Sequence, residues 1–356
     1  METRKVQVTG KSTFVVSLPK KWVVKVNIHM GDSVALIPLP DGTLLVNPHL
    51  ARKEKEHAKK TILVDEDVDQ MQRSFVAAYL AGYNIVEFRS RSPINKELKS
   101  SIRKISKSVI GPEIVEEGDN SVMVRNLLDS SDFTFSKGIR RMHVVARDMH
   151  MVAMEALKTG RQDLADDVRE RDDDVDKLYW MIAKQYNLVL RDVSFADRMG
   201  IRPQDALGYL LVARALERIA DHAVRIANYS NDMKKRTDIV IKIQEASGNI
   251  LTLLDDAANA FYKGRFDQAY EIVNNGREMA KLTMRLTQDA VAMHAESELS
   301  VPLAFIIDSL DRTRAYAVDI AETAINHIFC VQFGEDLMSH NLPKMDQVAS
   351  IESNKR

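Results

Sequence analysis

The chain has 356 residues, 45% hydrophobic and 28% charged, which is typical of a soluble globular protein with about two or three domains. The net charge of −1 argues against a protein whose whole surface binds nucleic acid. However, residues 1–60 hold eleven Lys and Arg against five Asp and Glu, so a polyanion would meet the N-terminal end. A single cysteine, Cys330, excludes an internal disulfide framework. The absence of a signal-peptide pattern and of an apolar run of membrane length predicts a cytoplasmic protein.

Residues 1–50 are predicted to form short strands and turns. The segments FVVSLP, SVALIPL and TLLVNP are rich in β-branched and apolar residues, and Asp41-Gly42 is a hairpin signal between the last two. The GKST segment at residues 10–13 suggests a nucleotide-binding loop. However, Lys5 stands where that motif needs its first glycine, and a strand follows where the motif needs a helix. We therefore expect a small β unit and no ATPase.

Residues 61–130 alternate between strand and helix patterns. TILVDE and IVEFRS are predicted strands, each followed by an amphipathic helical segment, and Gly118-Asp119-Asn120 is predicted at the tip of a final hairpin. The charged stretch before them, residues 51–60, has the composition of a solvated linker. The segment predicts a small α/β domain that acts as a spacer or dimerisation module, because it contains no catalytic constellation.

Residues 135–330 contain a weak internal repeat. EALKTGRQDLADDV, from Glu155, aligns with NAFYKGRFDQAYEI, from Asn259, and ALERIADHAVRIAN, from Ala215, aligns with SLDRTRAYAVDIAE, from Ser309. Each copy also has a proline suited to open a helix, namely Pro203 and Pro302. The pattern predicts two three-helix antiparallel bundles, at about 135–232 and 240–330, followed by a tail at 331–356.

Two helices of the first repeat carry acids within or beside their apolar stripes. Asp172 and Asp176 are four residues apart on one helix, and Glu217 and Asp221 are four apart on the next. Unpaired carboxylates facing a bundle interior are costly, so a partner must compensate for them. The partner is either a hard cation such as Mg²⁺, Mn²⁺ or iron, or arginine from the nearby Arg169, Arg171, Arg214, Arg218 and Arg225. Spacing leaves both alternatives open.

The second repeat lacks these acids. Superposing the copies puts Gly276 and Ala280 where Asp172 and Asp176 stand, and leaves Asp311 as the counterpart of Glu217. We therefore expect a metal site in the first repeat alone. The alternative is a different site in the second bundle, built from Asp255, Asp256 or Glu278. His222 is expected to be a polar bundle residue.

The N-terminal segments VQVTGKSTFVVSLPKKW and MGDSVALIPLPDGTLLV resemble the AbrB/SpoVT swapped-hairpin DNA-binding domain over residues 1–50. The resemblance implies a swapped-hairpin β-barrel made by two interlocking chains, hence a homodimer, with DNA on its basic face. The residues expected on phosphates or base edges are Arg4, Lys5, Lys11, Lys20 and Lys21. The alternative is that these side chains form a solvated surface.

Residues 135–330 resemble PhoU, a phosphate-uptake regulator built from two three-helix bundles, through LADDVRERDDDVDKLYW and LERIADHAVRIAN. This resemblance implies iron or zinc on Asp172, Asp176, Glu217 and Asp221, beside the magnesium or manganese that carboxylate ligands alone would suit. The chain as a whole is thus similar to archaeal PhoU-type regulators: a multidomain protein with a swapped-hairpin β-barrel, a small α/β linker domain and an all-α PhoU-like pair of bundles.

Two functions follow as expectations. The first is a dimeric DNA-binding regulator of phosphate-uptake genes that senses phosphate status through its PhoU-like half. The alternative is a cytoplasmic adaptor that negatively regulates a phosphate ABC transporter or its sensor kinase by contact, without binding DNA. No base or nucleophile accompanies the acids, so an enzyme is not expected.

Overall fold

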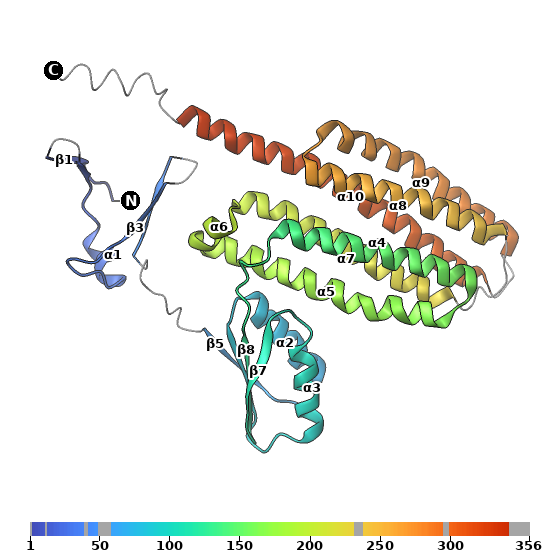
Figure 1. Ribbon diagram of the computed structural model, residues 1–356, viewed down its shortest axis with the longest axis horizontal. Coiled ribbons are helices and arrows are strands. Elements are labelled where there is room, and N and C mark those ends of the chain that lie inside the picture. Colours follow the sequence, from blue (N-terminus) through green and yellow to red (C-terminus); the bar gives the residue numbers. More distant parts are fainter. Residues whose placement is uncertain are drawn as a thin grey trace. The chain divides into compact units, whose positions relative to one another are not determined.

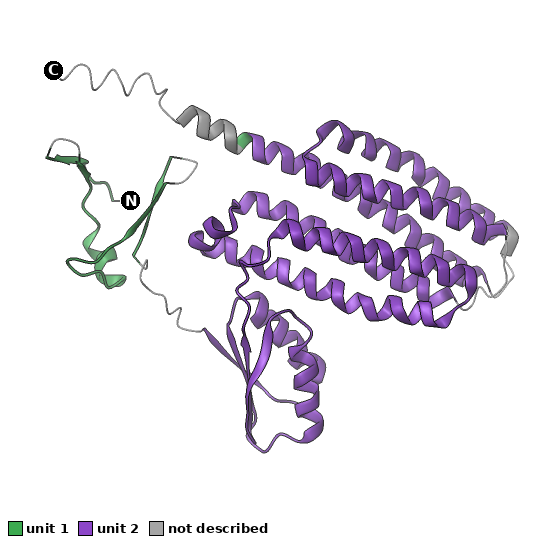
Figure 2. Cartoon of the chain, viewed as in Figure 1, with its two compact units in different colours: residues 1–56, 333–356 green, residues 57–332 purple. Residues whose placement is uncertain are grey.

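The computed structural model describes residues 2–10, 13–38, 42–48, 58–230, 238–294 and 299–341. The chain divides into two compact units, residues 1–56 with 333–356, and residues 57–332 (Figure 2). Within the described ranges, no helix is long and apolar enough to cross a membrane.

The N-terminal part of the first unit contains two short hairpins and one helix. The hairpins are β1 (Gln7–Thr9) with β2 (Thr13–Val15), and β3 (Ala35–Pro38) with β4 (Leu44–Asn47); the helix is α1 (Lys20–Lys25). The second pair confirms the expected hairpin, although Asp41 of its turn lies outside the described residues. In the described part of this single chain the two sheets remain separate and close no barrel. A barrel shared by two chains stays a prediction.

Residues 59–126 form an α/β domain around one four-stranded sheet. Its elements are β5 (Lys59–Leu63), α2 (Val68–Leu80), β6 (Ile85–Arg89), α3 (Lys96–Ser106), β7 (Pro112–Glu117) and β8 (Ser121–Asn126). The strand order is β5-β6-β8-β7, with β5 and β6 parallel and the other neighbours antiparallel. Both helices begin as the sequence dictates, because the side chains of Asp67 and Asn95 accept hydrogen bonds from backbone N–H groups at the helix starts. They lie on one side of the sheet (Figure 1), where Phe75 and Phe88 are buried.

The remaining helices form two bundles (Figure 1). The first consists of α4 (Phe135–Thr159), α5 (Gln162–Arg191), the short α6 (Val193–Met199) and α7 (Pro203–Tyr229). The second consists of α8 (Asp238–Lys263), α9 (Phe266–His294) and α10 (Ser300–Asn341). Three long helices per repeat are as predicted, whereas α6 was not expected and α10 continues past residue 330. Gly160 and Gly264 align because each glycine adopts the left-handed conformation directly after a helix, with φ of 69° and 60°.

Polar groups connect the two bundles through α4 and α8. The Nε2 atom of His150 lies 2.9 Å from Ser247 Oγ, and both side chains are buried. Further along α8, Asp255 accepts a hydrogen bond from Arg147 Nε at 2.8 Å and lies 3.0 Å from His143 Nε2. The repeats are therefore joined by specific polar contacts within their shared apolar core.

The α/β domain packs against α5. The side chains of Asn187 and Arg191 donate to the carbonyl oxygens of Leu80 and Ala81, at 3.1 and 2.8 Å. The buried Lys184 ammonium lies 4.3 Å from the centre of the Tyr79 ring, and burial lowers the pKa of Lys184 to about 8. These contacts place α2 alongside α5.

Candidate functional site

The four predicted acids lie on α5 and α7 of the first bundle. On α5 the acidic residues Asp172 and Asp176 flank Val175, which is fully buried, as the spacing predicts. On α7, Glu217 is 8% exposed. The carboxylates of the two helices are near enough to influence one another's pKa, while their role as one site stays a prediction.

Burial and mutual repulsion disfavour the charged forms of these acids. Burial, followed by the carboxylates of Asp176 and Asp221, raises the pKa of Asp172 to about 7. Burial also raises the pKa of Glu217 to about 7, with a further contribution from Asp221, although Arg214 and Arg218 oppose the shift. The pKa of Asp176 is raised by burial and then by Asp221. The site is therefore short of positive charge near neutral pH.

Arginine compensates for only part of this charge. On α7, Arg214 Nη1 lies 3.0 Å from Glu217 Oε1, and Arg218 Nη1 lies 2.9 Å from Asp221 Oδ2. The other candidate arginines have other acidic partners: Arg169 pairs with Asp166, Arg171 with Asp148 and Asp167, and Arg225 with Asp308. Arginine, one of the two compensating partners left open by the sequence, thus pairs with both acids of α7.

The α5 carboxylates have no such partner. Among the described residues, no cation forms an ion pair with Asp172 or Asp176. The buried atoms Asp172 Oδ1 and Glu217 Oε2 have no hydrogen-bond partner there either. Carboxylate oxygens are the donors that hard cations prefer, so the donor chemistry and the two unsatisfied oxygens fit a cation. However, no three acidic, His or Cys side chains in the described ranges are grouped closely enough to hold a metal ion. The metal remains a prediction.

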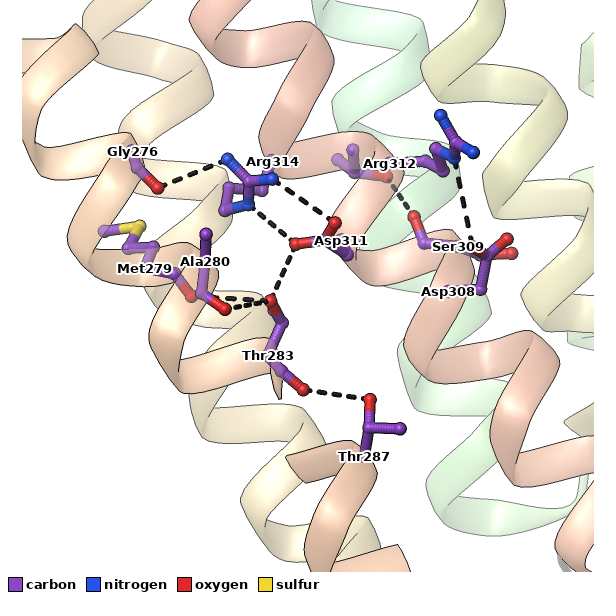
Figure 3. A network of polar contacts seen from close by, with 11 residues as sticks. Gly276, Met279, Ala280, Thr283, Thr287, Asp308, Ser309, Asp311, Arg312 and Arg314 are labelled. Atoms are coloured by element: carbon purple, nitrogen blue, oxygen red, sulfur yellow. Dashed lines mark hydrogen bonds and ion pairs between the residues drawn. The ribbon is translucent and has the colours of Figure 1, made fainter. Parts of the chain in front are cut away.

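In the second bundle an arginine, Arg314, pairs with Asp311, the counterpart of Glu217 (Figure 3). Arg314 on α10 donates from Nε to Asp311 Oδ1 at 2.7 Å and from Nη1 to the carbonyl oxygen of Gly276 at 3.2 Å. Thr283 on α9 donates to the same Asp311 oxygen at 2.6 Å. Although burial opposes it, the hydrogen bonds from Arg314 and Thr283 lower the pKa of Asp311. The protein itself therefore supplies the positive charge that compensates the Asp311 carboxylate.

Packing explains why α9 has a glycine, Gly276, at the position that corresponds to Asp172 of α5. A Cβ atom at Gly276 would overlap Val318 Cγ2 of α10, so no larger side chain fits there without movement. Two of the three acids considered for a separate second site also have cationic partners. Asp255 contacts Arg147 and His143, and Glu278 pairs with Lys281 at 2.8 Å.

The N-terminal basic residues lie at the surface. Lys5, Lys20 and Lys21 are exposed, the latter two at the start of α1, and Arg4 pairs with Glu2. Lys11 lies outside the described residues. Exposure is compatible with both DNA contact and a merely solvated surface, so the assignment of these residues to DNA stays a prediction.

A cleft between the α/β domain and α5 escaped the sequence analysis. It has a volume of about 1020 Å³ and is lined by α2, α3 and α5 residues, including Asp173 and Asp176. The cleft arises where two domains distant in sequence pack together, so local patterns do not predict it. The lysines along α3 are its one visible sequence feature.

Comparison with known proteins supports the assignment of the helical region. Residues 139–230 match the PhoU domain. The chain is 23% identical over 217 residues to a phosphate-specific transport system accessory protein PhoU homolog of Clostridium acetobutylicum, covering 57% of this chain and 94% of the relative. It is 22% identical over 196 residues to PhoU homolog 1 of Thermotoga maritima, covering 52% and 80%.

Two crystal structures of PhoU resemble the helical region. That of Pseudomonas aeruginosa PhoU covers 55% of this chain and 95% of its own, with a TM-score of 0.49 and 17% identity. That of the phosphate transport system regulatory protein PhoU of Streptococcus pneumoniae covers 54% and 92%, with a TM-score of 0.45 and 16% identity. The helical region of this chain is therefore PhoU-like, with the domain match at residues 139–230.

Proposed function

We propose that this protein is a regulatory accessory protein of phosphate transport that acts by contact with a transporter component or its sensor kinase. The observation that carries the proposal is the PhoU domain at residues 139–230, together with relatives named as accessory proteins of phosphate-specific transport systems. This role is not catalytic, and it is the second of the two functions expected from the sequence.

The acidic cluster is the sensing element in this proposal. The carboxylates of Asp172, Asp176, Glu217 and Asp221 would hold a divalent or trivalent cation, whose positive charge would offset their repulsion. Arg214 and Arg218 hold the α7 acids in the absence of a cation, because each pairs with one of them. Occupancy of the cluster would thus change the surface charge of the first bundle.

The test is the rate of phosphate uptake in cells grown with abundant phosphate. Cells that lack the protein should take up labelled phosphate faster than cells that carry it, because a negative regulator has been removed. Restoring the full chain should return uptake to its low rate. Equal uptake rates with and without the protein would count against a role in phosphate transport.

DNA binding by the N-terminal unit is the second candidate function. Its support is the net charge of residues 1–60 and the exposure of Lys5, Lys20 and Lys21. None of the described residues among 2–38 and 42–48 is buried, and Phe14 and Val24 are 74% and 70% exposed. A segment with so little core would gain stability from a second copy, as a swapped-hairpin dimer requires.

A gel shift on the upstream region of the protein's own operon tests this second function. Specific binding should weaken steeply as salt rises, because cations released from DNA drive it. Replacing Lys20 and Lys21 with alanine should lower the slope of log K against log salt by about 2. Absence of binding at any salt concentration would leave contact regulation as the sole function proposed.

A further inference from the structure

The cleft between the α/β domain and the first bundle has a volume of about 1020 Å³. One wall is formed by α2 and the C-terminal end of α3, and the other by α5. Ligand pockets in proteins typically measure about 300–1,000 Å³, so this cleft has room for a ligand much larger than a phosphate ion.

The α/β wall of the cleft carries three exposed cations, Arg73, Lys104 and Lys107. Within the described ranges, none of the three forms an ion pair. Two other α3 cations do: Lys99 and Arg103 lie 3.6 and 2.8 Å from the Glu117 carboxylate. Lys99 and Arg103 thus share one carboxylate of β7, whereas Lys104 and Lys107, at the C-terminal end of α3, remain available to a ligand in the cleft.

The opposite wall, on α5, carries two acids and one lysine, Lys177, which lies 3.4 Å from Asp174, and the rest of the lining is partly apolar. Asp173 and Asp176 of α5 line the cleft across from the cations, and Trp180 lies one turn beyond Asp176. The apolar lining is completed by Val76, Leu80 and Ile105. Each wall therefore presents both signs of charge, since Asp69 lies on the α/β wall and Lys177 on the α5 wall, and this pattern favours a ligand that carries both charges.

We propose that this cleft binds a nucleoside polyphosphate as its Mg²⁺ complex. Arg73, Lys104 and Lys107 bind the phosphate oxygens, since guanidinium and ammonium groups form strong charge-assisted hydrogen bonds with phosphate. Magnesium in proteins is commonly held by one or two carboxylates together with substrate phosphates, which is the arrangement that Asp173 and Asp176 offer. The base packs on the apolar lining near Trp180, where a planar ring gains from stacking.

This site goes beyond the regulatory role proposed above and stands independently of it. Asp176 belongs both to the cleft and to the acidic cluster of the first bundle. A nucleotide in the cleft and a cation in the cluster would therefore influence one another through this carboxylate.

Titration calorimetry on the full chain tests the proposal, with ATP and MgCl₂ as the probe and inorganic phosphate with MgCl₂ as the comparison. Saturable binding of MgATP at micromolar to submillimolar concentration is expected. The double variant Lys104→Ala/Lys107→Ala should weaken it at least tenfold. The matched control, Arg91→Ala/Lys96→Ala, removes the same charge from exposed positions outside the cleft lining and should bind like the unaltered chain.

Fluorescence provides a second readout located in the cleft. The chain has two tryptophans, Trp22 and Trp180, so in the variant Trp22→Phe all tryptophan emission comes from Trp180. MgATP should change this emission with the same saturation curve as the calorimetric heat. No binding of MgATP, equal affinity in the cleft variant and the control, or phosphate binding as tight as MgATP would each overturn the proposal.

Discussion

The guanidinium of Arg314 holds the carboxylate of Asp311 at 2.7 Å, whereas the equivalent position in the first bundle is Ala220. The same fold therefore treats its interior acids in two ways. In the second bundle an arginine on the same helix neutralises the acid and also binds a carbonyl oxygen of α9 (Figure 3). In the first bundle the α5 acids lack such a partner within the described residues.

Replacing Arg314 with leucine should destabilise the protein by about 1–3 kcal/mol, because Asp311 would keep its charge in a half-buried place without its main partner. Urea unfolding at pH 7 measures the change. Arg312→Leu is the control, since the Arg312 side chain is 60% exposed and lies 3.9 Å from Asp308. Adding Asp311→Asn to Arg314→Leu should recover part of the loss. Equal stability of the two arginine variants would show that the Arg314 contacts contribute little.

Replacing Asp172 with asparagine should stabilise the protein at pH 8 in the presence of a chelator. The pKa of Asp172, about 7, is above that of an unfolded aspartate, so the carboxylate costs the fold stability as pH rises through 7. An uncharged amide avoids this cost, and we expect a gain of about 1 kcal/mol because solvent screens a partly exposed group. Glu170→Gln, at an exposed position on the same helix, is the control. A loss of stability in Asp172→Asn would contradict the described repulsion.

The double variant Asp172→Asn/Asp221→Asn should lose all bound metal, because it removes one carboxylate from each helix of the predicted site. Elemental analysis of protein purified without chelator or affinity metal measures the content. Glu278→Gln, which removes an exposed acid of the second bundle, should retain the metal. If the double variant keeps its full content, the four carboxylates are not the ligands.

The stability of the junction between the bundles should fall in mild acid because of His150. Burial lowers the pKa of His150 to about 4, with a smaller contribution from His222, while Ser247 is its hydrogen-bonding neighbour on α8. An unfolded histidine binds its proton near pH 6.5, so the stabilisation is present above that pH and is lost as pH falls toward 4. From pH 7 to pH 5 the loss from this group is about 2 kcal/mol.

Comparing the chain with His150→Gln isolates this contribution, because glutamine does not titrate. Urea unfolding at pH 7 and pH 5 should show a smaller pH-dependent loss in the variant. The same loss in both proteins would exclude His150 as the source.

Much of the fold could be predicted from the sequence because its signals are local. The 3.6-residue periodicity, Pro203 and the glycines at 160 and 264 set the helices, and Gly118-Asp119-Asn120 set a hairpin. The convergence of α5 and α7 acids also followed from spacing. The partner of Asp311 did not, although Arg314 lies only three residues away, because spacing cannot show whether a long side chain turns toward an acid or toward water.

Other features depend on contacts between elements distant in sequence. The burial of His150 arises from the packing of α4 against α8, and the cleft arises from the packing of α2 against α5. The periodicity of a single helix does not predict which other helix it packs against. The hairpin of β3 and β4 was anticipated from its turn residues, whereas a barrel shared by two chains stays a prediction.

The central claim is that the protein regulates phosphate transport by contact. The most direct measurement is the rate of labelled phosphate uptake, under abundant phosphate, in cells whose sole copy carries Lys5→Ala, Lys20→Ala and Lys21→Ala. These exposed substitutions remove three of the five predicted DNA contacts and leave the PhoU-like residues 139–230 unchanged. The account predicts uptake as low as with the unaltered protein. Uptake as fast as in cells lacking the protein would contradict it and would show that regulation passes through the basic N-terminal unit.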